Sequence, residues 1–227
     1  MNNLLKVKYL LVVCIILSLT LPGCGLFGTK GEKSAPELAS EGMDDFKSGR
    51  YRKSIESFEK LKDWYPFSKY AILAELKIAD AHYCLKEYEE AIFAYEEFEN
   101  LHPNNEAIPY VIYRIGLCYF EQISTPDRDQ TSANKAKATF NRLIKQFPQN
   151  RYTIKGKESI KRCDKSLAEA VFGIGLHYYK NKHYKGALAR FKEVISSYPD
   201  VGIHQRALQY IAMCEVSLKE NKELTDK

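Results

Sequence analysis

Residues 168–199 read AEAVFGIGLHYYKNKHYKGALARFKEVISSYP, and this stretch decides the fold. Gly175 and Ala187 are small residues that let two helices approach closely, and Phe191 lies one helical turn after Ala187 on the same face. Pro199 ends the second helix because it has no N–H to donate and clashes with the preceding turn. The polar segment 181–183 predicts a short turn. The stretch therefore predicts two antiparallel helices packed against each other.

The second half of this unit recurs along the chain. Each copy ends in an aromatic residue or histidine followed by proline, at Tyr65-Pro66, His102-Pro103, Phe147-Pro148 and Tyr198-Pro199. Pro66 and Pro103 are 37 residues apart, close to the roughly 34-residue period of the tetratricopeptide repeat. Such a helix pair cannot bury its apolar face alone and needs neighbours of the same kind. The sequence therefore predicts an all-α tetratricopeptide-repeat solenoid of about five helix pairs over residues 37–219, followed by a short tail at 220–227.

The resemblance to a known family that is described below implies where the helices lie. The expected ranges are 37–48, 51–64, 69–84, 88–101, 107–122, 133–147, 152–181, 184–197 and 203–219. The seventh is unusually long because no proline interrupts residues 152–182, and its glycines only weaken it.

The N-terminus has the features of an export signal. Lys6 and Lys8 precede an apolar run that is too short to span a bilayer comfortably. The run ends in Leu21-Pro22-Gly23-Cys24, which resembles a bacterial lipobox although Pro22 is unusual there. We therefore predict a signal peptide at 1–23, lipidation of Cys24 and a flexible tether at 24–36. The alternative is an ordinary secretory signal with an incidental cysteine.

Charge and motifs argue against an enzyme. Residues 32–103 hold 16 acidic and 10 basic side chains, whereas residues 151–199 hold 4 and 11, so the two ends have opposite charge. They indicate two different partners, unless they are only solvated helix faces. The basic end lacks the interleaved aromatics of nucleic-acid binders. No metal-ligand cluster, phosphate-binding loop or nucleophile motif is present, so neither a metal, a cofactor nor catalysis is expected. Cys84 and Cys118 are the one pair worth testing for a disulfide.

Two motifs are more specific than the repeat. Tyr65-Pro66-Phe67-Ser68-Lys69-Tyr70 follows the first repeat, and Asp127-Arg128-Asp129-Gln130 precedes the helix expected from residue 133. With the lipobox and the final repeat, they resemble the BamD family, the tetratricopeptide lipoproteins of the outer-membrane β-barrel assembly machinery. The likeness runs from about residue 37 to about residue 217. The loop before Asp127 and the C-terminal tail are shorter here than in the family.

The resemblance implies an outer-membrane lipoprotein, anchored on the periplasmic face, that scaffolds the assembly complex and receives unfolded outer-membrane proteins. Gly25 after the cysteine resembles lipoproteins that are sent to the outer membrane. The N-terminal repeats would bind the aromatic-rich C-terminal strand of the substrate through Tyr65, Phe67 and Tyr70. Alternatively these residues only pack the first repeat on the second, which suits Phe67 better than the tyrosines, whose hydroxyls favour a wet edge.

The basic C-terminal repeats would dock on the periplasmic POTRA domains of the barrel-forming subunit, with Arg190 as the candidate contact. The alternative for Arg190 is to solvate its own helix. Asp127, Arg128 and Asp129 are expected to cap the following helix and hold the loop, and other lipoproteins are possible further partners. The alternative function is that of a pilotin-like chaperone lipoprotein or a cell-envelope scaffold, which would need neither motif.

Overall fold

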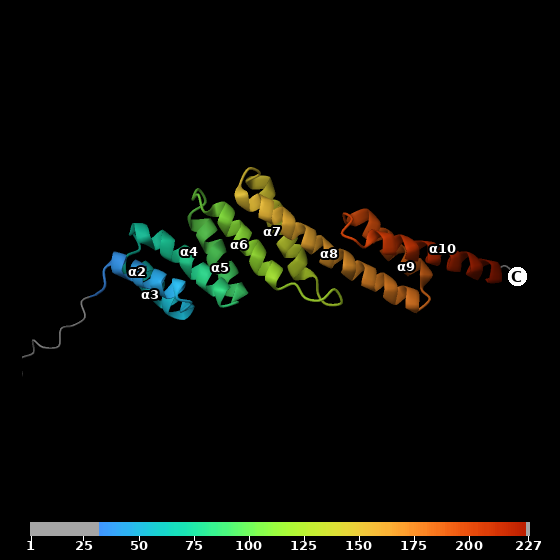
Figure 1. Cartoon of the computed structure of the whole chain (residues 1–227), viewed down its shortest axis with the longest axis horizontal. Helices are drawn as coiled ribbons and strands as arrows, with labels where there is room; N and C mark the ends of the chain where they lie inside the picture. Colours follow the sequence, from blue (N-terminus) through green and yellow to red (C-terminus); the bar gives the residue numbers. More distant parts are fainter. Residues whose placement is uncertain (1–31, 226–227) are drawn as a thin grey trace, which may run out of the picture.

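The computed structural model describes residues 32–225, and within them every regular element is an α-helix. The helices follow one another along the long axis of the molecule, with α2 at one end and α10 at the other (Figure 1). Their bounds are α2 Ala35–Lys47, α3 Tyr51–Trp64, α4 Lys69–Cys84, α5 Tyr88–Leu101, α6 Ile108–Glu121, α7 Thr131–Gln146, α8 Arg151–Lys180, α9 Tyr184–Ser197 and α10 His204–Thr225. The described part of the chain thus forms four helix pairs and one last helix, and the all-α solenoid is confirmed.

A glycine and an aromatic ring join the two helices of three pairs. A β-carbon at Gly175 would lie 2.7 Å from Cε1 of Phe191, which is closer than real carbon atoms approach. Gly42 has the same relation to Phe58, and Gly116 to Phe140, and all three rings are completely buried. The sequence predicted a close approach of the helices at Gly175, and the structure shows that the contact between a glycine and an aromatic ring occurs in three pairs. Because each ring fills the space left by the missing side chain, the helices pack without a void.

The long helix α8 is confirmed, at Arg151–Lys180. Its 30 residues span about 45 Å, so it contacts two neighbours in succession. Near its start, Gly156 lies against Leu143 and Phe140 of α7, and near its end Gly175 lies against Phe191 of α9. The helix therefore connects the central pairs to the C-terminal pair (Figure 1).

Both ends of the solenoid extend beyond the predicted boundaries. Helix α2 begins at Ala35 rather than 37, because the Ser34 backbone N–H donates to Glu37 Oε2 at 2.8 Å and closes a capping box. Helix α10 continues to Thr225, so residue 219 lies inside the helix. The segment expected as a tail from residue 220 is therefore helical as far as residue 225. Its residues 219–223 contain neither glycine nor proline, and the spacing of Lys219 and Glu223 favours a helix.

A buried polar cluster connects three helices at the middle of the N-terminal half. Asp80 of α4 is only 3% exposed, and its Oδ1 accepts hydrogen bonds from the hydroxyls of Tyr95 (2.6 Å) and Tyr110 (2.5 Å). Lys77 lies 2.7 Å from Oδ2, and the Arg114 guanidinium donates to the Tyr95 hydroxyl. Burial, with the nearby Asp80 carboxylate, raises the pKa of Tyr95 and Tyr110. The cluster is fully bonded and therefore fixes the register of α4, α5 and α6.

The four cysteines of the solenoid are free thiols. Cys84 is exposed whereas Cys118 is buried, so the pair considered for a disulfide is not joined in this structure. Burial raises the pKa of Cys118 to about 12 and of Cys163 to about 11, so these two thiols are unreactive packing residues. No helix in residues 32–225 combines the length and apolar character needed to cross a bilayer.

Candidate peptide-binding surface

An aromatic edge lies where α3 turns into α4. Trp64 is the last residue of α3, and Phe67 stands in the turn before α4. The side chain of Phe67 is fully exposed, and that of Trp64 is 49% exposed. The Ser68 hydroxyl accepts from the backbone N–H of Tyr70 at 3.2 Å and starts α4, which holds the turn in place. Two large aromatic side chains thus face solvent beside a turn that a side-chain hydrogen bond connects to the start of α4.

The two tyrosines of the motif pack on the core and do not lie at the solvent-exposed edge that the sequence predicts. Tyr65 and Tyr70 are half-buried and pack against the core formed by α2, α3 and α4, and the Tyr65 hydroxyl donates to the carbonyl oxygen of Lys33 at 3.0 Å. The alternative in which Phe67 packs the first repeat on the second is wrong, because its side chain is fully exposed. Of the three aromatic residues of the motif, only Phe67 is fully exposed, whereas Tyr65 and Tyr70 pack on the core.

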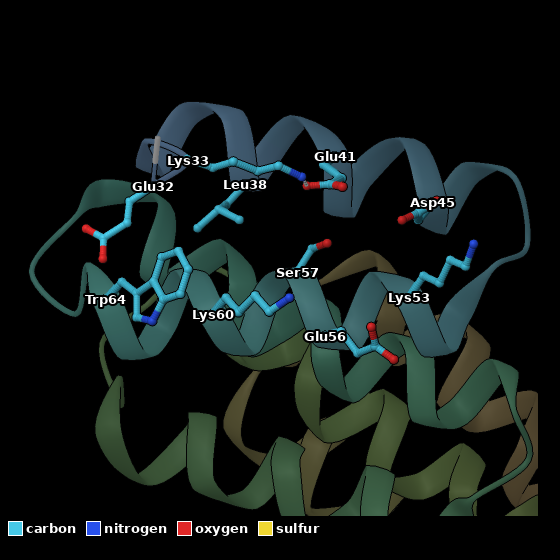
Figure 2. A pocket seen from close by; sticks show the side chains of 10 residues that line it. All are labelled: Glu32, Lys33, Leu38, Glu41, Asp45, Lys53, Glu56, Ser57, Lys60 and Trp64. Atoms are coloured by element: carbon cyan, nitrogen blue, oxygen red, sulfur yellow. Dashed lines mark hydrogen bonds and ion pairs between the residues drawn. The ribbon is translucent and has the colours of Figure 1, made fainter. Parts of the chain in front are cut away.

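Trp64 also closes a groove between α2 and α3. The groove has a volume of about 540 Å³ and is lined by Glu32, Lys33, Leu38, Glu41, Asp45, Lys53, Glu56, Ser57, Lys60 and Trp64. Figure 2 shows the residues of α3 in one row facing Leu38 and Glu41 of α2, with the indole of Trp64 at the end of the row. The row has the spacing of one helix face, since Lys53, Ser57, Lys60 and Trp64 are three or four residues apart. Sequence reasoning missed Trp64, although it is the one tryptophan of the chain.

The charges in this groove are only partly paired. Lys33 lies 2.5 Å from Glu41, and Asp45 lies 2.6 Å from Nε of Arg50. Lys53 and Lys60 form no ion pair with any residue in the described range 32–225. Glu32 and Glu56 in the lining are also unpaired within residues 32–225, and the apolar end made by Trp64 and Leu38 adjoins the two free ammonium groups. This combination suits an aromatic side chain next to a carboxylate.

Arg190 lies at the opposite end of the solenoid. It is exposed on α9, and its Nη1 lies 2.6 Å from Oε2 of Glu193 one turn later. Both partners are accessible, so this pair contributes little to stability and leaves the guanidinium available at the surface. The structure does not bring Arg190 near the aromatic edge, because α9 and α3 belong to different ends of the molecule (Figure 1).

The loop at 127–130 is held by its own side chains. Asp129 Oδ1 accepts from the backbone N–H of Thr131 at 3.1 Å and from its hydroxyl at 2.8 Å, and α7 begins at Thr131 instead of 133. A hydrogen bond from Thr125 lowers the pKa of Asp127. Gln130 donates to the carbonyls of Thr125 and Arg128 and accepts from Ser166 of α8. The residue that connects the loop to α8 is thus Gln130, to which the sequence motif had assigned no role of its own.

Two further expectations concern the chemistry of the chain. Cys24 and the preceding signal lie outside the described residues. Within residues 32–225, no three histidine, cysteine, aspartate or glutamate side chains are grouped so that they could hold a metal ion.

Solved structures show what the fold of this chain resembles, and sequence relatives show its family. The structure resembles the tetratricopeptide domains in the complex titled "TPR2AB-domain:pHSP90-complex of yeast Sti1", with a TM-score of 0.52 and 18% identity over 81% of this chain and 70% of that one. At this identity the likeness shows the fold alone.

Sequence relatives add the family. The family described as "YfiO: Outer membrane lipoprotein" matches residues 31–227. The "Outer membrane protein assembly factor BamD" of Rickettsia prowazekii is 32% identical over 86% of this chain and 78% of its own length. The protein of the same name from Caulobacter vibrioides is 26% identical over 93% of this chain and 71% of its own. The chain therefore belongs to the YfiO family of outer-membrane lipoproteins, the family of BamD.

Proposed function

We propose that this chain is an assembly factor for outer-membrane proteins, held at the periplasmic face of the outer membrane by lipids on Cys24. The observation that carries this is the match of the BamD relatives across almost the whole chain, including both ends of the solenoid. A helical-repeat scaffold with two separate exposed ends suits a protein that joins a substrate to a larger complex. Its role is that of a non-catalytic adaptor.

The N-terminal end receives the substrate in this proposal. The ligand is an unfolded outer-membrane protein whose last strand ends in an aromatic residue. Its terminal ring lies against Trp64 and Leu38, its carboxylate faces Lys60, and Phe67 contacts the preceding residues. Tyr65 and Tyr70 act indirectly, by holding the turn. The motivating geometry is the exposed aromatic edge beside a groove with two unpaired lysines.

The C-terminal end docks on the barrel-forming subunit through its periplasmic POTRA domains. Residues 151–199 carry 11 basic and 4 acidic side chains, so they favour an acidic partner surface. Arg190 is the contact to test because its guanidinium is accessible on α9. Other lipoproteins of the complex could occupy the remaining faces. Isolation of the full-length chain from solubilised outer membrane should bring the barrel-forming subunit with it, and its absence would contradict the proposed function.

Peptide binding can be followed with the protein's own fluorescence. Trp64 is the one tryptophan, so a peptide ending in phenylalanine should shift its emission to the blue as the indole is covered. In an anisotropy titration, Phe67→Ser and Lys60→Glu should each weaken binding of the labelled peptide by about tenfold. Phe93→Ser is the matched control, since it removes another exposed ring from a different surface. Unchanged emission at saturating peptide would remove Trp64 from the site.

Membrane attachment through Cys24 is tested separately. Cys24→Ala removes the thiol that would carry the acyl chains, so the variant should leave the membrane fraction and take up no labelled palmitate. Cys14→Ala is the control because it changes a cysteine inside the predicted signal. Continued palmitate labelling of Cys24→Ala would contradict the anchor.

A further inference from the structure

A second groove lies on the other side of α3, between α3 and α5. Its volume is about 450 Å³, and it is lined by Glu59, Lys62, Ile78, His82, Glu89, Glu90, Phe93, Ala94 and Glu97. A small extension reaches Glu75 and Phe98. Since Glu59 and Lys62 face this groove whereas Lys60 and Trp64 face the other, α3 separates it from the proposed substrate surface.

The groove has an apolar centre. Phe93 of α5 is 70% exposed at its edge, and Ile78 of α4 forms a floor that is almost completely buried. Phe98, which is also on α5, is buried in the core, so the exposure of Phe93 is not a property of the whole of α5. An exposed ring beside an apolar floor is a surface on which a partner can bury an apolar side chain.

Four carboxylates surround this centre. Glu59, Glu89, Glu90 and Glu97 form no ion pair with any side chain in residues 32–225, and the basic residues in the lining are Lys62 and His82, of which His82 is paired with Glu87. Neighbouring acids behave differently: Glu87 pairs with His82 and Arg52, and Glu99 pairs with Arg142. The unpaired acids are therefore concentrated around Phe93, and they produce a negative potential that the single ammonium group of Lys62 offsets only in part.

We propose that this groove docks a basic segment of another protein of the cell envelope. The segment carries one apolar side chain, which inserts between Phe93 and Ile78, and lysine or arginine residues on either side that face the four glutamates. The charge of the groove decides the class of partner, because an acidic segment or an anionic lipid surface would be repelled. Substrate ending in a carboxylate is disfavoured for the same reason.

The test uses the full-length chain in a nonionic detergent and a fluorescein-labelled peptide with one leucine between two pairs of lysines. Anisotropy should show saturable binding that weakens as salt is added. Phe93→Ser should weaken binding about tenfold, and the double variant Glu90→Lys with Glu97→Lys should weaken it further. The same peptide with serine in place of leucine should bind at least tenfold less tightly, since the apolar anchor is gone.

Matched controls lie on the same helix. Glu96→Lys changes the charge of an exposed residue outside the groove, and Leu101→Ser removes an exposed apolar side chain outside it. Both should bind the peptide as the native chain does, and thermal unfolding should be unchanged in all four variants. If Glu96→Lys weakens binding as much as Glu90→Lys with Glu97→Lys, or if the serine peptide binds equally well, the interaction is only diffuse attraction and the proposal fails. Concentration-dependent self-association that Phe93→Ser abolishes would instead assign the groove to a second copy of this chain.

Discussion

Individual glycines show how strongly this fold depends on single residues. Gly173 and Gly175 are two residues apart on α8 and face different surroundings. A β-carbon at Gly173 would meet nothing within 4 Å, whereas one at Gly175 would overlap the ring of Phe191. The same amino acid is therefore indispensable at one position and replaceable at the other.

This contrast predicts opposite effects of one substitution. Gly175→Ala should destabilise the protein by about 1–3 kcal/mol, because the ring of Phe191 is buried and cannot move aside without strain. Gly173→Ala should stabilise it by up to about 1 kcal/mol, because alanine favours the helix. Urea unfolding of both variants measures the two changes. A loss of stability in Gly173→Ala, or none in Gly175→Ala, would contradict this account of the helix crossing.

The elements α4 and α6 are joined by an aromatic and cationic stack. The Arg114 guanidinium lies 3.7 Å from the centre of the Tyr83 ring, and its Nε donates to the Tyr95 hydroxyl. Burial is the main cause that raises the pKa of Tyr83, to about 12, and the positive charge of Arg114 opposes this shift only in part. The hydroxyl therefore holds its proton in the folded chain at a pH where an unfolded tyrosine, with a pKa of about 10, has lost it.

The sign of the pH effect follows from this difference. Between about pH 10 and 12 the folded state binds more protons than the unfolded state, so the free energy of unfolding falls as the pH rises. The contribution of the buried Tyr83 phenol to the free energy of unfolding is complete below pH 10 and is lost by about pH 12. Tyrosinate absorbance of the native chain compared with Tyr83→Phe should show that the Tyr83 phenol titrates at a higher pH than an exposed tyrosine, and urea unfolding at pH 9 and 11 should show the loss of stability. A free energy of unfolding that is equal at these two values would contradict the buried phenol.

At the scale of the whole molecule, the solenoid separates its two proposed surfaces. The aromatic edge lies on α3 and α4, and Arg190 lies on α9, with α5 to α8 between them (Figure 1). Each pair contacts mainly its neighbours, so a change at one surface has no direct route to the other.

Substitutions at the two ends should therefore act independently. Arg190→Glu should weaken binding to the barrel-forming subunit by about tenfold, with a strong salt dependence because the side chain is exposed, and it should leave peptide binding unchanged. Phe67→Ser should do the reverse. Calorimetric titration of both variants with both partners gives all four affinities, and Lys192→Glu tests whether any reversed charge on α9 has the same effect. Loss of peptide binding in Arg190→Glu would show that the ends are coupled or assigned in reverse.

The sequence by itself determined the helix pairs, their order and the length of α8. These depend on local properties: prolines that end helices, glycines and alanines at crossings, and the 3.6-residue period of the apolar positions. Ordered repeats such as these contact only their neighbours, so local patterns are enough to define most of the architecture.

Only the tertiary structure decided which side chains of a motif face solvent. Tyr65, Phe67 and Tyr70 look alike in sequence, yet two pack inward and one is fully exposed, because the turn between α3 and α4 sets their directions. The groove beside Trp64, the buried cluster around Asp80 and the unpaired glutamates around Phe93 are formed by residues from two or three helices. Their juxtaposition depends on how neighbouring pairs are rotated against each other, which no local pattern contains.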